Sequence, residues 1–334
     1  MRTILLVLLM VLSVRPACAE RERQASPDSG RLSRVFGATF PSTYTIYALN
    51  PDLLAGWNGP LRGYEAKYIP QKYQNLPILG GWFGQGFFPD REVLLAQKID
   101  TAFLIASEGN LSRTIESALK KIGMPVLTKQ VVYLRDYIPM FRELGDEFGM
   151  PERGRALAEY AAKALDDTAA MVAEVPEEEK VRVYLAQEVD GLGTVCDSAT
   201  RTEAVRLAGG VSVHKCPAAL SESTIKVSFE QIMVYDPDVL LILHPSFMER
   251  FPNDAKWKNL RAVREGRVYF VPHEPFSWLD KPATYMRLIC LQWLACTLYP
   301  DRCGKDIVKE TAEFMKLFFN LDLDEAAVKS ILKQ

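Results

Sequence analysis

Short apolar runs alternate with longer amphipathic stretches along most of the chain, a pattern typical of strands followed by helices. One such unit occurs twice, at residues 90–105 and 228–243. Each copy has a capping residue, a glutamate two positions later, a short apolar helix, an acidic turn and an apolar strand. The alternation of strands and helices predicts parallel sheets that are covered by helices on both faces.

The glutamates of the two copies, Glu92 and Glu230, occupy the same place. Each stands eight residues before the final aspartate of its copy. A carboxylate in the first turn of a helix is stabilised by the free backbone amides there, so a capping role would explain either residue alone. The repeated spacing favours a shared function instead. It predicts two similar α/β units that each present one carboxylate at a helix start.

A long helical pattern separates the two units. Residues 151–175 are rich in Ala, Glu, Lys, Arg and Leu, with Pro151 in the first turn and Pro176 just past the end. At about 1.5 Å per residue, this helix would span roughly 35 Å. We therefore predict an N-terminal α/β lobe at 34–150 and a C-terminal α/β lobe at 176–334. Each lobe would hold a central, mostly parallel sheet flanked by helices, and the one long rigid helix would join them.

The beginning of the chain has the features of an export signal. A basic start precedes an apolar run from Ile4 to Val14, and Ala17-Cys18-Ala19 fits the small-x-small rule for cleavage. We expect a signal peptide at 1–19, a loose polar terminus at 20–33 and a mature protein in the periplasm. Lipidation at Cys18 is the alternative, which Arg15 and Pro16 disfavour because small or apolar residues are expected there.

Charge and motifs narrow the classes of function. Removing Arg2 and Arg15 with the leader from the 40 basic residues leaves 38 against 42 acidic residues, a formal net charge of −4. Such a balance provides no general attraction to nucleic acid or acidic membranes. The chain also has no Gly-x-Ser-x-Gly elbow, His-Glu-x-x-His zinc helix, P-loop or Cys-x-x-Cys pair. An exported α/β enzyme is therefore the less favoured class.

Five cysteines remain after the leader, and an oxidising compartment would allow two disulfides with one thiol left over. The pairs nearest in sequence are Cys196 with Cys216 and Cys296 with Cys303, which leaves Cys290. Buried free thiols are the alternative.

The order of parts resembles the periplasmic binding proteins of ABC importers for iron complexes, siderophores, haem and cobalamin. The most specific string is Trp257 to Tyr269, whose tryptophan, Ala-Val pair and Gly-Arg-Val-Tyr turn stand in the family's order. The resemblance also rests on Phe40-Pro41-Ser42, residues 90–104, Ile122-Gly123-Met124-Pro125-Val126, Gly209-Gly210 and residues 228–242. It implies a protein without enzymatic activity or cofactor that captures a metal complex between its lobes and delivers it to an ABC permease.

The resemblance also implies a partner surface. In this family, the glutamate of each repeat docks onto arginines of the permease in the inner membrane, and the matching positions here are Glu92 and Glu230. We expect a monomer that binds a small-molecule metal complex and no nucleic acid. Signalling to a receptor through the same surface is an open alternative.

Ligands of open α/β sheets collect beyond the carboxyl ends of the strands, so we expect the solute between two such edges. His244 and His273 each follow a predicted strand, and either could supply one axial metal ligand; a hydrogen-bonded structural role is the alternative. Arg287 could pair with a ligand carboxylate or with a neighbouring acid. The ligand-binding candidates are Tyr44, Trp57, Trp82 and Phe83 in the first lobe and His244, His273, Trp278 and Arg287 in the second.

The aromatic candidates favour a bulky chelate stacked on rings, with core packing as the alternative for the Gly-rich aromatic loop. The first lobe has no histidine, which disfavours capture of bare zinc or manganese by ligands from both lobes. In the iron-complex branch of the family, an arginine stands at the position of Lys281, so an anion-binding role is not carried over to that residue. An iron chelate is the first choice of solute; cobalamin, haem, a nickel chelate and molybdate or tungstate are the alternatives.

Overall fold

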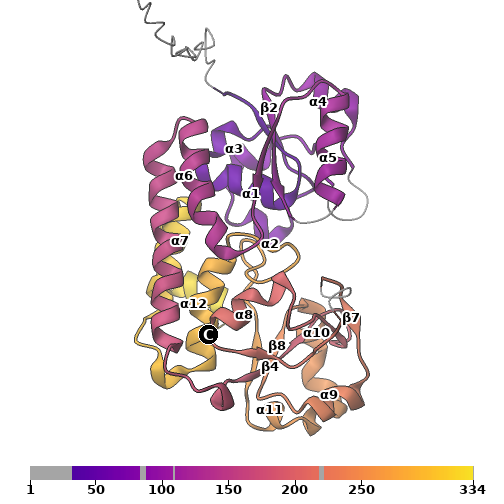
Figure 1. Cartoon of the computed structure of the whole chain (residues 1–334), viewed down its shortest axis with the longest axis vertical. Helices are drawn as coiled ribbons and strands as arrows, with labels where there is room; N and C mark the ends of the chain where they lie inside the picture. Colours follow the sequence, from indigo (N-terminus) through magenta and orange to yellow (C-terminus); the bar gives the residue numbers. More distant parts are fainter. Residues whose placement is uncertain (1–31, 83–87, 108–109, 218–221, 334) are drawn as a thin grey trace, which may run out of the picture. The chain divides into compact units, whose positions relative to one another are not determined.

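The computed structural model describes residues 32–82, 88–107, 110–217 and 222–333 (Figure 1). The predicted signal peptide at 1–19 and the candidate Phe83 lie outside the described residues, and both stay predictions. Among the helices of the described part, none is long and apolar enough to cross a lipid bilayer.

The first sheet has three parallel strands in the order β1 (Val35–Gly37), β2 (Thr101–Ala106) and β3 (Val126–Gln130). Successive residues of a strand point to opposite faces. Phe36 and Leu104 therefore pack in one cluster with α4 (Arg91–Ala96) and α5 (Asn110–Lys121), while Phe103 packs on the other face, in the cluster that contains α1 (Phe40–Leu49). This arrangement covers both faces of the sheet, as the strand-helix alternation predicts.

The second sheet has four parallel strands in the order β6 (Val211–Ser212), β4 (Arg182–Ala186), β8 (Val239–Ile242) and β9 (Val268–Phe270). The four residues of β8 are all buried because they alternate between two hydrophobic clusters. A separate antiparallel pair is formed by β5 (Gly193–Thr194) and β7 (Ile225–Lys226). The fold is therefore α/β, with two mostly parallel sheets flanked by helices.

The remaining helices complete the layers around these sheets. They are α2 (Gly63–Ala66), α3 (Gln71–Gln74), α6 (Tyr137–Glu147), α7 (Pro151–Val172), α8 (Glu203–Leu207), α9 (Phe229–Tyr235), α10 (Pro245–Arg250), α11 (Arg261–Arg264), α12 (Arg287–Leu298), α13 (Ile307–Phe319) and α14 (Glu325–Leu332).

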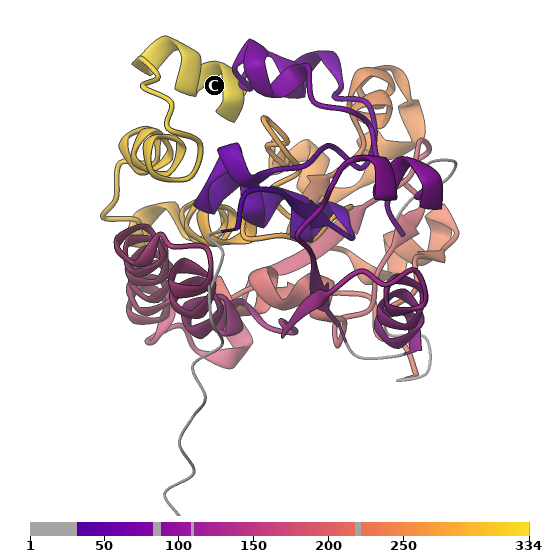
Figure 2. The ribbon, with the colours of Figure 1, turned by 90° about the horizontal axis from the view of Figure 1, so that it is seen from above.

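The long helix predicted between the repeats is α7, whose 22 residues span about 33 Å at 1.5 Å per residue. It lies beside α6 in both views (Figures 1 and 2). A Cβ built on Gly145 would stand 2.7 Å from the Cα of Gly154, so the two glycines allow this close approach. On the side of the second sheet, α7 contacts α12 and α8. Helix α7 thus contacts helices from both halves of the chain. The lobe boundaries at 34–150 and 176–334 stay predictions.

The duplicated sequence unit is a duplicated structural unit. The Asp90 side chain accepts the backbone N–H of Glu92 and Val93 at the start of α4, at 2.8 and 3.0 Å. The Ser228 hydroxyl accepts the N–H of Gln231 at the start of α9, at 3.1 Å. Both capping predictions are therefore confirmed.

The final aspartates of the two copies also match. Asp100 accepts the backbone N–H of Arg34 at 2.8 Å, next to the start of β1. Asp238 accepts the N–H of Arg182 at 2.8 Å, at the start of β4. Each carboxylate therefore ties its turn to the neighbouring parallel strand, which gives a structural reason for the fixed distance from the cap to the aspartate.

Of the two alternatives that the sequence leaves open for the cysteines, the structure has the disulfides, Cys196 with Cys216 and Cys296 with Cys303. Cys290 is a buried thiol on α12. Burial raises the pKa of this thiol, so it stays protonated and behaves as a small apolar residue.

Candidate ligand cleft

A cleft of about 840 Å³ lies where the carboxyl ends of the strands of both sheets meet. From the first half it is lined by residues that follow β1, β2 and β3, among them Thr39, Ser107 and Val131. From the second half it is lined by residues 200–201, which follow β5, and by Ser277 and residues 280–283, which follow β9. The solute was predicted at this position. Loops beyond the carboxyl ends of parallel strands are not part of the sheet, so their side chains can contact a ligand.

Aromatic rings form one wall of the cleft. Tyr44 of α1 lines it and stacks on Phe276 of the second half, with ring centroids 3.6 Å apart and planes 6° apart. Phe40 lies one helical turn away, with its centroid 5.9 Å from Tyr44. Burial raises the pKa of Tyr44 well above its ordinary value, so the ring is neutral and offers an apolar face.

A buried ion pair also lines the cleft. Asp280 is 6% exposed as a residue, and its carboxylate accepts hydrogen bonds from both Nε and Nη2 of Arg201. It also accepts Nε2 of Gln187 at 2.8 Å and the backbone N–H of Lys281 at 2.8 Å. Such a bidentate, fully hydrogen-bonded pair holds the loop after β9 against residues 200–202. Arg201 and Asp280 therefore shape the cleft and are satisfied by each other.

Arg287, at the start of α12, lines the cleft, but its guanidinium contacts other groups of the protein. It is 4% exposed, donates Nη1 to the carbonyl of Thr200 at 3.0 Å and lies 3.5 Å from Oε2 of Glu203. Glu203 in turn accepts the backbone N–H of Leu134, at 2.9 and 3.1 Å. The sequence left open whether Arg287 pairs with a ligand carboxylate or with a neighbouring acid. In the structure, a neighbouring acid, Glu203, is its partner. Burial raises the pKa of this acid, Glu203.

Two other cations of the cleft are solvated. The Arg62 side chain is 66% exposed, and its nearest carboxylate oxygen, on Glu65, is 3.9 Å away. The Lys281 side chain is 52% exposed and pairs with the equally solvated Glu188. Exposed pairs of this kind are weak, so both cations can turn toward an anionic ligand at little cost. Arg62 comes from the first half and Lys281 from the second.

One acid of the lining is strongly desolvated. Glu65, 7% exposed, accepts the backbone N–H of Arg62 at 2.6 Å. Burial nevertheless raises the pKa of its carboxyl, because the loss of hydration outweighs that hydrogen bond.

The tryptophan candidates lie in the core rather than in the lining. Trp57 is 3% exposed and donates Nε1 to the carbonyl of Tyr73 at 2.7 Å. Trp278 is fully buried and donates Nε1 to the carbonyl of Glu274 at 2.9 Å. Trp82 packs, partly buried, on the apolar cluster of the first sheet. The core-packing alternative given for the Gly-rich loop describes the place of Trp82, and Trp57 and Trp278, predicted at the ligand, lie in the core as well.

The histidine candidates also lie outside the lining, which contains no histidine among the described residues. His244 is the N-cap residue of α10. His273 follows β9, and its ring meets Tyr64 and Phe270 edge-on, each with centroids 4.9 Å apart. Burial lowers the pKa of His273 and keeps the ring neutral. Neither His244 nor His273 lines the cleft, so the proposed solute site does not include an axial metal ligand from a histidine.

Sequence reasoning missed Arg62, Arg201 and Asp280. Arg62 stands in a Gly- and Pro-rich loop whose path no periodicity predicts. The pairing of Arg201 with Asp280 joins segments 79 positions apart, and neither residue carries a local motif.

The repeat glutamates stand as predicted in the first turns of α4 and α9, and both are exposed. Hydrogen bonds from its own backbone N–H and from Ser228 lower the pKa of Glu230. Exposed apolar side chains follow each glutamate on its helix. They are Val93 and Leu95 on α4, and Met233 and Val234 on α9.

Two parallel sheets whose strand ends converge on one cleft define a solute-binding class of fold. The chain belongs to the family described as periplasmic binding protein, whose model matches residues 103–275.

Individual relatives agree with this assignment. A solved structure of an ABC transporter solute binding protein from Sulfurospirillum deleyianum is 34% identical, with a TM-score of 0.85 over 91% of this chain and 95% of that one. The molybdate-binding protein MolA of Haemophilus influenzae is 26% identical over 62% of this chain and 58% of its own length. The Fe(3+)-citrate-binding protein YfmC of Bacillus subtilis is 26% identical over 54% of this chain and 56% of its own. The chain thus spans somewhat more than half the length of these two curated relatives.

Proposed function

We propose that this protein is an exported solute-binding protein that captures an anionic metal chelate and delivers it to an ABC permease. The observation that carries the proposal is the cleft of about 840 Å³ with one solvated cation from each half, Arg62 and Lys281. The similarity to an ABC transporter solute binding protein over nearly the whole chain supports the transport role.

Size and lining favour a chelate over a bare oxyanion. Pockets of about 300–1,000 Å³ accommodate ligands of drug-like size, and a tetrahedral oxyanion of five heavy atoms would leave most of this cleft empty. Apolar contacts are available from Phe40, Tyr44 and Ile105, which suit the organic part of a chelate. Carboxylate groups of a chelate can bind Arg62 and Lys281 through charge-assisted hydrogen bonds. A ferric complex of a polycarboxylate, as in the name of YfmC, combines both features.

Calorimetric titration of the purified protein tests the choice of solute. We expect ferric citrate to bind more tightly than molybdate, tungstate, haem or cobalamin. Arg62→Gln and Lys281→Gln should each weaken binding between about 10-fold and about 100-fold, because a hydrogen bond to a charged group is worth about 1.5–3 kcal/mol. Lys72→Gln is the matched control, since Lys72 is an exposed cation on α3 outside the lining. Tight binding of molybdate with no measurable affinity for chelates would overturn the choice in favour of an oxyanion.

The permease contact is the second part of the proposal. Glu92 and Glu230 are exposed carboxylates at equivalent places of two repeated units, and neither lines the cleft. An acidic residue surrounded by exposed apolar side chains suits an interface in which an arginine of the partner pairs with it. The two glutamates should therefore affect delivery and leave capture unchanged.

A further inference from the structure

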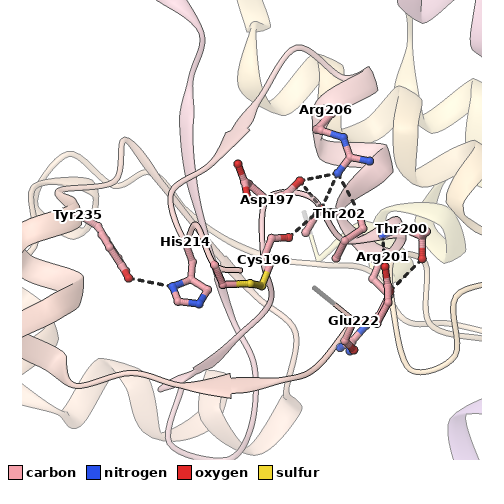
Figure 3. The surroundings of a disulfide bond; sticks show 11 residues. Cys196, Asp197, Thr200, Arg201, Thr202, Arg206, His214, Glu222 and Tyr235 are labelled. Atoms are coloured by element: carbon pink, nitrogen blue, oxygen red, sulfur yellow. Dashed lines mark hydrogen bonds between the residues drawn. A yellow bond between two sulfur atoms is a disulfide. The ribbon is translucent and has the colours of Figure 1, made fainter. Parts of the chain in front are cut away.

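Three side chains with metal-binding atoms gather outside the lining of the cleft, at Cys196, His214 and Cys216 (Figure 3). One ligand atom from each lies within 4.8 Å of the others. The two sulfurs are joined as a disulfide, and none of the three residues lines the ligand cleft. The cluster is therefore not part of the cleft lining described above.

Local backbone structure brings the three residues together. His214 and Cys216 follow β6 two positions apart, and one ligand atom of each lies within 4.8 Å of the other. Cys196 follows β5, and the next residue, Asp197, donates its backbone N–H to the carbonyl of His214 at 2.8 Å. That bond holds the two segments side by side whether or not the disulfide is present.

The segment of Cys196 is fixed from its other side as well (Figure 3). The Thr202 hydroxyl donates to the carbonyl of Cys196 at 3.1 Å. Arg206 donates Nη1 to the carbonyls of Asp197 at 2.6 Å and Ala199 at 2.9 Å. Opening the sulfur–sulfur bond therefore removes one of several restraints and leaves the backbone frame in place.

His214 has the environment of an oriented metal ligand. It is 7% exposed, and its Nδ1 lies 2.8 Å from the Tyr235 hydroxyl. In the part of the chain that the structure describes, its buried Nε2 has no hydrogen-bond partner. A ligating histidine commonly donates one ring N–H to an outer partner and offers the other nitrogen to the metal. The Tyr235 contact supplies that outer partner and leaves Nε2 as the ligand atom.

We propose that reduction of the Cys196–Cys216 disulfide creates a zinc site formed by Cys196, Cys216 and His214, with water as the fourth ligand. A dithiol reductant transfers two electrons and two protons to the disulfide and itself becomes a disulfide. One Zn²⁺ then displaces the two thiol protons and binds two thiolates and one imidazole. Oxidation of the thiolates by a disulfide-carrying oxidant reforms the native bond and releases the ion. The site is thus a redox-gated metal site.

The distances permit this exchange. Tetrahedral zinc with Zn–S bonds of about 2.3 Å and Zn–N bonds of about 2.0 Å places its ligand atoms about 3.5–3.8 Å apart. The two sulfurs and one ring nitrogen of His214 already lie within 4.8 Å of one another, and the Cα atoms of the two cysteines are 5.7 Å apart. Rotation of the side chains suffices. Cys216 is only partly buried, which gives the ion and its water ligand a path from solvent.

The test uses the whole protein with Cys296→Ser and Cys303→Ser, so that one disulfide remains. After anaerobic reduction with a water-soluble phosphine, Zn²⁺ is titrated in competition with a chromophoric chelator, and Co²⁺ serves as a spectroscopic substitute. We expect one tightly bound ion per chain and sulfur-to-cobalt charge-transfer absorption in the reduced protein only. His214→Gln should weaken Zn²⁺ binding by at least about 10-fold.

The second disulfide provides the matched control, because no histidine joins it in a metal-binding group among the described residues. A chain with Cys196→Ser and Cys216→Ser, reduced in the same way, should show no tight binding. Equal affinity in oxidised and reduced protein, an unchanged affinity in His214→Gln, or tight binding by the control chain would each overturn the proposal. If the serine background fails to fold, the fully reduced wild-type chain and its His214→Gln variant give the same comparison.

Discussion

Removal of the Asp280 carboxylate is the most direct test of how the cleft is built. In Asp280→Ala, the Arg201 guanidinium loses its bidentate partner, and the side-chain amide of Gln187 and the N–H of Lys281 lose their acceptor. The Asp280 side chain is 5% exposed and that of Arg201 is 18% exposed, so water replaces these bonds only in part.

The expected loss follows from that burial. Breaking a buried ion pair by removing one partner costs about 3–5 kcal/mol, because an uncompensated charge remains. Since Arg201 keeps some contact with water, and since it also donates to the carbonyl of Glu222, we place the loss of unfolding free energy near the lower limit, at about 3 kcal/mol. For a chain of this size, that corresponds to a fall in Tm of several degrees. Affinity for the solute should fall too, because the wall of the cleft loses its anchor.

Urea unfolding followed by tryptophan fluorescence measures this loss. Asp322→Ala is the control: Asp322 pairs with Lys316 at the surface, with side chains 79% and 53% exposed, and such a pair is worth at most about 1 kcal/mol. Asp280→Asn, which keeps an acceptor for the N–H of Lys281, should fall between the two. A loss in Asp280→Ala as small as that in Asp322→Ala would refute the view that this pair supports the cleft.

Three further outcomes are expected. The combination Glu92→Arg and Glu230→Arg should abolish uptake by whole cells while solute affinity, measured by calorimetry, stays unchanged. Tyr68→Phe removes a 2.7 Å hydrogen bond from a buried hydroxyl to Glu274, and urea unfolding should show a loss of about 1.5–3 kcal/mol. Glu65→Gln should raise stability at neutral pH and flatten its pH dependence. Burial raises the pKa of Glu65, so stability falls as pH rises from about 4.3 toward the raised native value, and glutamine, which cannot ionise, avoids that loss.

Matched surface variants accompany these tests. Glu325→Arg reverses an exposed charge in the first turn of α14 and should leave uptake intact. Tyr133→Phe changes a half-exposed tyrosine and should alter stability by less than about 0.5 kcal/mol. Glu313→Gln makes the same substitution at an exposed site on α13 and is the surface counterpart of Glu65→Gln. Uptake that persists in the double arginine variant would remove the docking role of the two glutamates.

Local sequence signals predicted the parts of this fold that depend on periodicity and capping. The strands β2 and β8, the helix α7 and the caps Asp90 and Ser228 all form where the pattern indicates. These features depend on neighbours a few positions apart, and a single sequence contains that information. The position of the cleft was also predictable, since it follows from strand direction alone.

The side chains that line the cleft were decided by the tertiary structure. Trp57 and Trp278 were predicted at the cleft because they stand near strand ends or loops, yet each ring fits the core and donates its N–H to a carbonyl there. A strand determines which face a residue points to, but the loop beyond it has no such period. Only the packing of distant segments therefore determines which loop residue faces the solute.

The sequence by itself thus determined the α/β class and the duplicated unit with its two glutamates at helix starts, while the choice between disulfides and free thiols was left to the structure. The tertiary structure alone decided that Arg201 pairs with Asp280, that Arg287 is held by Glu203, and that His214 lies beside a disulfide. The physical reason is the range of the interactions. Periodicity and capping act between neighbours along the chain, whereas buried charges and sulfur ligands find their partners only when segments far apart in sequence are packed together.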